Sequence, residues 1–502
     1  MNVLSHLQMG FSVCTEWTNL LLCFIGCLFG TLVGVLPGLG PSASIALLLP
    51  MTYKLTPVQA IIMLAGIYYG AQYGGSTSSI LVNIPGEAST VITTIDGYQM
   101  AKKGRAGPAL GMSAFGSFIG GTFAVIMMML LSPPLSEVAL KFGPTEMTTV
   151  MVFGLTMVIY LSEGSLVKGL SMGALGLLLG CVGTDLLTGR IRYTLGFGAL
   201  ADGLGVVPVA MGLFGVSEVL LTVEQSSQIA GVFRTKVKEL FPTKQDWKDS
   251  AGPITRGSIL GFFLGLIPGG GPVVASFFSY GIEKRLSKHP ERFGTGEIAG
   301  VSAPETANNA GAGGAFIPLM TLGLPCTPPM AVLLGAFIIQ GITPGPLLIE
   351  KHPDLFWGLV GSMYLGNIML LVLNLPLIGI WVKILKIPYI ILSPLILLFC
   401  LIGAYTINNS ISEIVIMVLF GIFGYLLKKF NYPLAPFILA FILGPMLEKY
   451  LGQAVMMSNE GPLVFFSRPI SGAFLIGTFF LLISPWILKL FRRKRFEGFD
   501  TK

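Results

Sequence analysis

Charged residues are scarce in this chain. They account for 11% of its 502 residues, whereas apolar residues account for 53%. Soluble domains carry about 25% charged residues, so this sequence cannot cover a surface that faces water. Apolar runs of roughly 20 residues, enough for one helix to cross a bilayer, recur from end to end and do not alternate as barrel strands do. We therefore expect an all-α polytopic membrane protein with about ten to thirteen transmembrane helices.

Histidine is rarer still, and this bears on catalysis. The three histidines lie near the N-terminus or in predicted loops, at positions 6, 289 and 352. A serine nucleophile in the membrane needs a histidine beside it, and an aspartyl mechanism needs paired acids at depth. The candidates Asp96, Asp185 and Asp202 each lie beside predicted loop residues. An intramembrane enzyme is therefore disfavoured, and no catalytic residue is predicted.

Cysteines are few and scattered, at positions 14, 23, 27, 181, 326 and 400. Cys23 and Cys27 lie one helical turn apart and could suggest a metal or disulfide pair. No histidine cluster accompanies them, so we interpret them as small core side chains.

Basic residues give the chain a net charge of +7, and they gather in short loops and at the C-terminus. This distribution follows the positive-inside rule, so we expect a lipid bilayer and no nucleic acid as partner. Residues 284–292, Lys383 with Lys386, 428–429 and 492–495 are predicted to be cytoplasmic. The first apolar run lacks a small-residue cleavage site and is interpreted as an uncleaved anchor.

An internal repeat organises the chain. Gly30, Gly34, Pro37, Gly38, Gly40 and Pro41 return in register as Gly261, Gly265, Pro268, Gly269, Gly271 and Pro272. A looser echo relates residues 73–75 and 84–86 to residues 312–314 and 324–325. We predict a first transmembrane repeat at 1–223, a charged linker at 224–256, a second repeat at 257–491 and a basic cytoplasmic tail at 492–502. The loop at 102–105 is basic and its counterpart at 350–354 is mixed, which favours inverted repeats.

Proline beside glycine interrupts both repeats inside apolar runs. Proline breaks a helix, and at bilayer depth such a break survives only where it lines a cavity or is buried in protein. Basic residues flank 256–280 on both sides, and each arm of about ten residues reaches ~15 Å. We predict a re-entrant hairpin there, with a discontinuous helix as the alternative.

The predicted binding site combines these corners with polar residues at membrane depth. Free amides and the positive ends of helix dipoles favour a carboxylate at the corners, and hydroxyls and amides suit a carboxylate or a sodium ion. The substrate-binding candidates are Pro37, Gly38, Gly40, Ser42, Ser44, Ser76, Thr77, Ser78, Ser79, Asn83, Pro268, Gly269, Gly271, Asn308, Asn309 and Thr321. The acids Glu87, Asp96 and Glu305 are candidates for ion coupling.

Structural interpretations of the same residues stay open. The paired glycines could serve only close helix packing. The hydroxyls of residues 76–79 could bond to the backbone of their own helix. The three acids could lie at the membrane–water interface. A channel would need a continuous selectivity filter, whereas duplicated broken helices favour alternating access.

The sequence resembles the large membrane subunit of the tripartite tricarboxylate transporters, the TctA family, over nearly its whole length. The stretches that carry the resemblance are Gly34-Val-Leu-Pro-Gly-Leu-Gly-Pro41, 73–87, Asp96-Gly-Tyr-Gln-Met100, 107–111, 296–309, Pro318-Leu-Met-Thr-Leu-Gly-Leu-Pro325 and 341–346. Where some relatives carry a small residue, this chain continues with Cys326-Thr-Pro-Pro329.

The resemblance implies a multi-pass permease of the bacterial inner membrane that imports small carboxylates by symport. It also implies two partners, a small transmembrane subunit (TctB-like) and a periplasmic substrate-binding protein (TctC-like). The energy would come from a Na⁺ or H⁺ gradient, in keeping with the missing Gly-x4-Gly-Lys-Ser/Thr phosphate loop, and no cofactor is expected. The departure at Cys326 leaves other di- or tricarboxylates and aromatic acids open as substrates.

Overall fold

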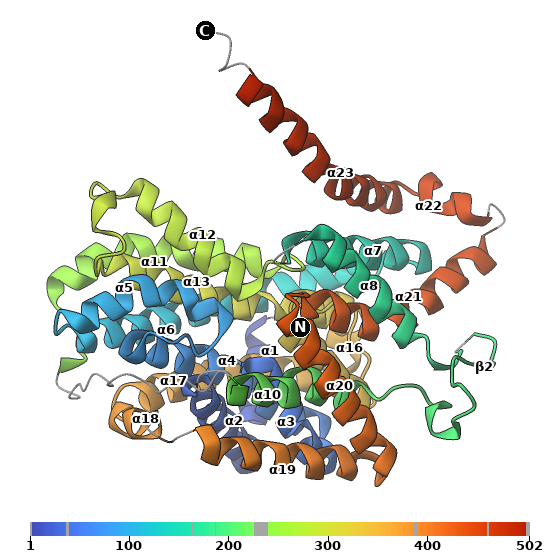
Figure 1. Cartoon of the computed structure of the whole chain (residues 1–502), viewed down its shortest axis with the longest axis horizontal. Helices are drawn as coiled ribbons and strands as arrows, with labels where there is room; N and C mark the ends of the chain where they lie inside the picture. The colour runs from blue at the N-terminus through green and yellow to red at the C-terminus, as the bar shows by residue number, and fades with distance from the viewer. Residues whose placement is uncertain are drawn as a thin grey trace. The chain divides into compact units, whose positions relative to one another are not determined.

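A computed structural model describes residues 3–36, 40–162, 165–185, 187–224, 239–385, 387, 389–458 and 461–497. These residues are helical almost throughout, apart from one short ladder in which β1 (Gly183–Thr184) pairs antiparallel with β2 (Ile191–Arg192). The predicted all-α membrane fold is confirmed. The chain divides into two compact units, which the colours of Figure 1 help to trace. Unit 1 comprises Met1–Ala139 and Gly205–Phe430, and unit 2 comprises Leu140–Leu204 and Asn431–Lys502.

The N-terminal part of unit 1 contains α1 (Val3–Cys14), α2 (Trp17–Val35), α3 (Pro41–Leu48), η1 (Leu49–Lys54), α4 (Pro57–Val82), η2 (Ala88–Thr90), α5 (Val91–Lys102) and α6 (Ala106–Ala139). Its C-terminal part begins with α9 (Val206–Ala210), the π-helical η4 (Met211–Val216), α10 (Ser217–Glu224), α11 (Lys244–Gly265), α12 (Gly271–Leu286), η6 (Pro290–Arg292) and α13 (Ala299–Gly314). It continues with α14 (Phe316–Leu322), α15 (Pro328–Ile339), α16 (Leu348–Lys351), α17 (Pro353–Asn374), α18 (Ile378–Ile384), α19 (Tyr389–Asn408) and α20 (Ile411–Lys429).

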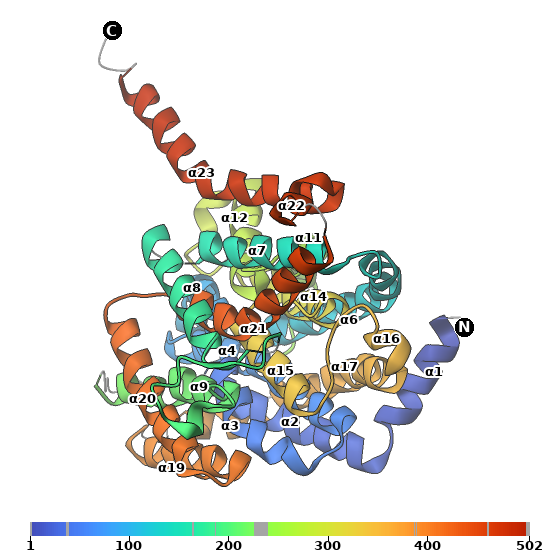
Figure 2. The ribbon, with the colours of Figure 1, turned by 90° about the vertical axis from the view of Figure 1, so that its right-hand side faces the viewer.

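Unit 2 contains α7 (Pro144–Leu161), α8 (Leu166–Gly180), the β1–β2 ladder, η3 (Gly198–Leu200), α21 (Leu434–Met457), η7 (Gly461–Leu463), α22 (Val464–Ser467) and α23 (Pro469–Glu497). Helices α8 and α21 lie side by side, although about 260 residues separate them along the chain (Figure 2). The described part of the predicted tail 492–502 continues α23 as far as Glu497.

The repeated glycines make equivalent helix contacts. A Cβ on Gly30 or Gly34 of α2 would lie 2.4 or 2.3 Å from the carbonyl oxygens of Ile67 or Ala71 on α4. On α11, Cβ atoms at Gly261 and Gly265 would lie 2.2 and 2.3 Å from carbonyl oxygens of α13. The packing interpretation of these glycines therefore holds, and α2–α4 and α11–α13 are matching pairs.

The helix ends extend this match and correct the register of the looser echo. Asn83 after α4 and Gly323 after α14 both adopt the left-handed conformation, with φ of 60° and 69°. Gly74 packs on the carbonyl of Thr31, and Gly314 packs on that of Phe262, its repeat partner. Gly74 thus corresponds to Gly314, one residue beyond the predicted alignment of 73–75 with 312–314. Helix α4 matches α13 and α14 together.

The matching helices run in opposite directions. Ser76 of α4 bonds to Glu305 of α13, while the ring of Tyr69, earlier on α4, packs against that of Phe316, later along the chain. Helices α4 and α13–α14 are therefore antiparallel neighbours, as inverted repeats require. Helix α6 packs on α13 and α17 packs on α4, so each repeat contacts the central helix of the other. Figure 1 shows α11–α13 beside α5 and α6.

The second proline–glycine corner joins two packed helices. The Arg256 guanidinium on α11 donates to both carboxylate oxygens of Glu283 on α12, each at 2.6 Å. The two helices lie against each other and turn back between residues 266 and 270, so this segment is a helical hairpin rather than a discontinuous straight helix. Its first arm begins at Lys244, inside the predicted linker 224–256, and both arms are longer than the predicted ten residues.

Seven described helices are long and apolar enough to cross a membrane, or eight if the bent pair at 461–484 counts as one span. The predicted range of ten to thirteen is larger because it also counted apolar runs that fold into shorter helices. In the same core, α4 has 26 residues but carries many serines and glycines, and nearly all of its residues are buried. It contacts protein rather than lipid, which relaxes the demand for apolar side chains.

Candidate functional site

A buried polar cluster surrounds Glu305 in unit 1. Glu305 lies on α13, and none of its surface is exposed. Its carboxylate oxygens accept hydrogen bonds from the hydroxyls of Ser76 on α4 and Thr93 on α5. Ser113 of α6 also lies near this carboxylate. The acid of the second repeat is therefore enclosed by three helices of the first.

Glu305 differs in its partners from three other buried acids. The buried carboxylates of Glu146, Asp246 and Glu283 each pair with an arginine, namely Arg468, Arg105 and Arg256. Among the described residues, Glu305 has no such cation and is bonded by hydroxyl groups. Burying an uncompensated carboxylate costs several kcal/mol. A proton or a bound cation would remove that cost.

Asp96 is held by the backbone instead. Its carboxylate accepts N–H bonds from Gly294, Gly296 and Glu297 at 2.7–3.0 Å, and the Tyr280 hydroxyl donates at 2.9 Å. The two glycines have φ of 90° and 106°, which lets the loop wrap around the acid. These bonds tie α5 of the first repeat to the loop between α12 and α13. They give Asp96 a structural role that needs no ion.

Glu87 lies at the start of the η2 turn and is partly exposed, unlike Glu305. Ser89 donates to its carboxylate and also lies 2.9 Å from the side-chain oxygen of Gln72. Glu87 occupies the position that matches Thr327 in the second repeat. The Tyr68 hydroxyl lies near both of these residues. The site is therefore acidic on one side and hydroxyl-bearing on the other.

The two corners differ in how much of them the structure describes. Pro37 and Gly38 lie outside the described residues. Gly40 precedes α3, and a Cβ added to it would meet nothing within 4 Å. In the second corner, the Gly269 amide donates to the carbonyl of Cys326 at 2.9 Å, and Gly271 packs against Thr327. Pro268 and Gly269 are partly exposed.

Several predicted binding residues bond within their own helix. Ser44 donates to Gly40, Ser78 to Gly75 and Thr321 to Ile317, all through side-chain hydroxyls. Ser79 donates to Gly75 and also lies 2.9 Å from Thr90 of η2. Asn83 is an exposed helix end with left-handed backbone. These positions match the structural interpretation of the motif.

The remaining predicted residues that the structure describes are buried. Asn308 and Asn309 follow Glu305 on α13, where the Asn309 amide donates to the Glu305 carbonyl at 3.2 Å. Thr77 is buried on α4, and Ser42 is buried at the start of α3.

Sequence reasoning missed Thr93, Ser113, Tyr68 and the Tyr73–Asn367 pair, whose side-chain oxygens lie 2.6 Å apart. A signal existed for the first: residues 89–94 contain four hydroxyl side chains directly after the 84–87 motif. Ser113, Tyr68 and Asn367 lie in apolar runs, where nothing in the sequence marks them as neighbours.

Broken helices, antiparallel repeats and a polar centre at the point where they meet define this chain as a multi-pass membrane protein of the transporter class. The chain belongs to the tripartite tricarboxylate transporter TctA family, whose family model matches residues 20–439.

Two relatives from Agrobacterium vitis extend the comparison. An uncharacterised 52.8 kDa protein of the TAR-I ttuC' 3' region is 50% identical over 501 residues, which cover 99% of each chain. An uncharacterised protein of the TAR-II ttuC' 3' region is 49% identical over 239 residues, or 48% of this chain and 98% of the relative. No solved structure matches the chain.

Proposed function

We propose that this chain is the large membrane subunit of an ion-driven symporter that imports small carboxylates across the bacterial inner membrane. A small transmembrane subunit (TctB-like) and a periplasmic substrate-binding protein (TctC-like) complete the transporter. Family membership supports the tripartite plan, and the antiparallel repeats support alternating access. The family's description as tricarboxylate transporters supports small carboxylates as the proposed substrate class.

The observation that carries this proposal is the cation-free burial of Glu305. A carboxylate bonded by hydroxyls from two helices can accept a proton, and the same oxygens can ligate Na⁺. Occupation by either ion neutralises the buried charge and draws the two repeats together. Loss of the ion leaves a charge that disfavours the closed arrangement. Glu305 is therefore the proposed coupling group, with no other cofactor.

The substrate carboxylate binds between the corners and the two matching turns at 84–90 and 324–327. The first-turn amides of α3 and α12 lack intrahelical acceptors and carry the positive ends of the helix dipoles. Glu87 faces the same region, and its negative charge repels the substrate carboxylate unless a coupling cation binds with the substrate. This repulsion links the coupling ion to the substrate.

Replacing Glu305 by Gln tests the coupling role. The amide preserves the size of the side chain but carries no charge, so gradient-driven accumulation in proteoliposomes containing all three subunits should fall at least 100-fold. Exchange of labelled for unlabelled substrate at equal ion concentrations should persist, because exchange needs no net ion movement. Exposed Glu291→Gln serves as the matched control and should accumulate substrate normally.

The ion itself is identified in the same vesicles. A Na⁺ gradient at clamped pH drives uptake only if Na⁺ is the coupling ion. A pH gradient without Na⁺ drives uptake only if H⁺ is the coupling ion. Normal accumulation by Glu305→Gln would remove Glu305 from the mechanism while leaving the transporter assignment intact. Uptake that follows ATP rather than either gradient would contradict the assignment.

A further inference from the structure

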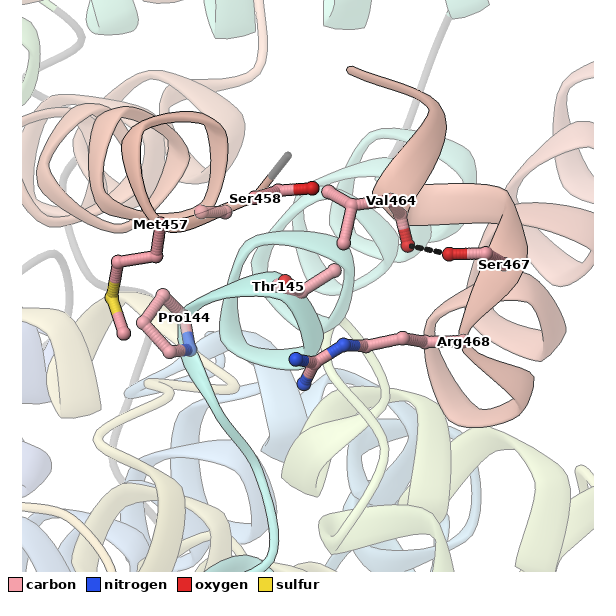
Figure 3. A pocket seen from close by; sticks show the side chains of 8 residues that line it. Pro144, Thr145, Met457, Ser458, Val464, Ser467 and Arg468 are labelled. Atoms are coloured by element: carbon pink, nitrogen blue, oxygen red, sulfur yellow. Dashed lines mark hydrogen bonds between the residues drawn. The ribbon is translucent and has the colours of Figure 1, made fainter. Parts of the chain in front are cut away.

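Unit 2 contains a cavity of about 300 Å³ at one end of its helices. The side chains lining it come from the start of α7, the end of α21 and the turn between α22 and α23 (Figure 3). Its polar lining comprises Thr145, Ser458, Ser467 and Arg468, and its apolar lining includes Met457 and Val464. None of these residues belongs to the cluster around Glu305.

Arg468 is the charged residue of this cavity. One nitrogen of its guanidinium donates to the two carboxylate oxygens of Glu146, at 3.2 and 3.3 Å. These distances exceed the usual 2.7–2.9 Å of charge-assisted bonds, so the pair is loose. Glu146 is buried and also accepts the Gly143 amide at 2.9 Å. About half of the Arg468 side chain is exposed, and its other donors point toward the start of α7 (Figure 3).

The turn beside the cavity indicates where it lies. The segment Gly461–Ser467 makes an angle of 87° with Pro469–Ser484, which is apolar enough to belong to a span. We take Pro469–Ser484 as the part that crosses the bilayer, so that Gly461–Ser467, at nearly a right angle to it, lies along the bilayer surface. Leu463 and Phe466 on this segment are 68% and 73% exposed, and Met457 at the rim is 77% exposed. Apolar and aromatic side chains of this kind are typical of the interface between headgroups and acyl chains.

We propose that this cavity binds the phosphodiester group of a membrane phospholipid, with Arg468 and the hydroxyl of Thr145 as its donors; the Ser467 hydroxyl donates to the Val464 carbonyl at 3.3 Å and is not counted among them (Figure 3). The planar guanidinium matches the paired oxygens of a phosphate. The acyl chains then lie along Leu463 and Phe466, outside the cavity. Glu146 orients the guanidinium and limits the positive charge, so the site holds one lipid rather than attracting anions in general.

Lipid binding is measured by native mass spectrometry of the detergent-purified full chain titrated with phosphatidylglycerol. Arg468→Gln should weaken the first bound lipid about tenfold or more, the usual effect of losing a charge-assisted bond. Glu146→Gln removes the competing carboxylate and should tighten binding severalfold. Exposed Arg190→Gln, in the same unit, is the matched control and should bind as the wild type does.

Two further ligands separate the sources of affinity. Diacylglycerol, which lacks the phosphate, and inorganic phosphate, which lacks the chains, should each fail to displace phosphatidylglycerol at equal concentration. Displacement by diacylglycerol would mean a merely apolar surface, and displacement by phosphate would mean a site for free anions; either overturns the proposal. Equal binding by wild type and Arg468→Gln also overturns it. If Arg468→Gln does not fold, Glu146→Gln provides the test. Unchanged or weaker lipid binding by Glu146→Gln would then overturn the proposal.

Discussion

Asp96 and Glu305 are both fully buried acids of unit 1, and both were candidates for ion coupling. Their partners separate them. Asp96 accepts hydrogen bonds from backbone amides in a loop of the second repeat, and these bonds compensate its charge. Glu305 is surrounded by hydroxyls that can donate to it or share an ion with it. The first arrangement stabilises one structure, and the second permits two charge states.

Replacing Asp96 by Ala should therefore destabilise the protein, because it leaves three amides and the Tyr280 hydroxyl without their acceptor. We expect a loss of about 3–5 kcal/mol, which is the range for breaking a buried charged network. Thermal unfolding in detergent measures it as a lower Tm, while Glu305→Gln should keep its Tm within a few degrees. A variant of Asp96 with wild-type Tm and no gradient-driven uptake would instead assign the coupling role to Asp96.

At the scale of elements, glycine determines how closely the central helices pack. Helices α2 and α4, and likewise α11 and α13, approach until backbone meets backbone at Gly34 and Gly265. Such contacts replace side-chain packing by dispersion between backbones, as small residues do in membranes.

Gly265→Ala should cost about 1–3 kcal/mol or more, the usual penalty of overpacking, because the new Cβ would lie 2.3 Å from the Gly311 carbonyl oxygen. Gly281→Ala on the exposed face of α12 meets nothing within 4 Å and should be neutral or stabilise by up to about 1 kcal/mol. The Tm of the two variants, measured side by side, checks the difference. Equal shifts would show that loss of glycine flexibility, rather than close approach, governs both.

For the molecule as a whole, the two repeats of unit 1 are interlocked rather than placed side by side. Helix α13 packs on α6, and α4 packs on α17, so neither repeat completes its own core. Unit 2 likewise combines residues from both halves of the chain. The compact units therefore do not coincide with the repeats, and the predicted repeat boundaries at 223 and 257 stay a prediction.

Cleavage between the halves tests this interlocking. A protease site inserted between residues 231 and 232 should give two fragments that co-elute after cleavage, since their contacts are tertiary. Gradient-driven uptake should remain within about twofold of the uncut protein, because coupling is expected to depend on packing. Each half expressed alone should aggregate, because its central helix lacks the partner that covers it. Fragments that separate on a sizing column would show that the repeats are joined mainly by the chain.

Much of the architecture could be predicted from the sequence. The apolar runs established a membrane protein, the repeated Gly-x-x-x-Gly and Pro-Gly patterns located both corners, and the basic flanks favoured the hairpin that α11 and α12 form. The site was predicted in part. Ser76 and Glu305 were named as candidates, but their direct bond joins residues 229 positions apart, which no local pattern encodes.

The remaining errors have one physical origin. The echo of 73–75 was misaligned by one residue because glycine-rich stretches offer several matches, and only the carbonyl contacts of Gly74 and Gly314 select one. Ser78 and Thr321 seemed free to bind ligands because a helical hydroxyl and a ligand-binding hydroxyl have the same sequence signature.

Composition and motifs thus determined that this protein lies in a lipid bilayer, that its plan is duplicated and where its helices break. They could do so because hydropathy and backbone conformation are local properties. Tertiary structure alone decided which buried acid is compensated, which hydroxyls face it and which halves share a unit. Those outcomes depend on distances between residues far apart in the chain, and burial changes the energy of a charge only after such neighbours are in place.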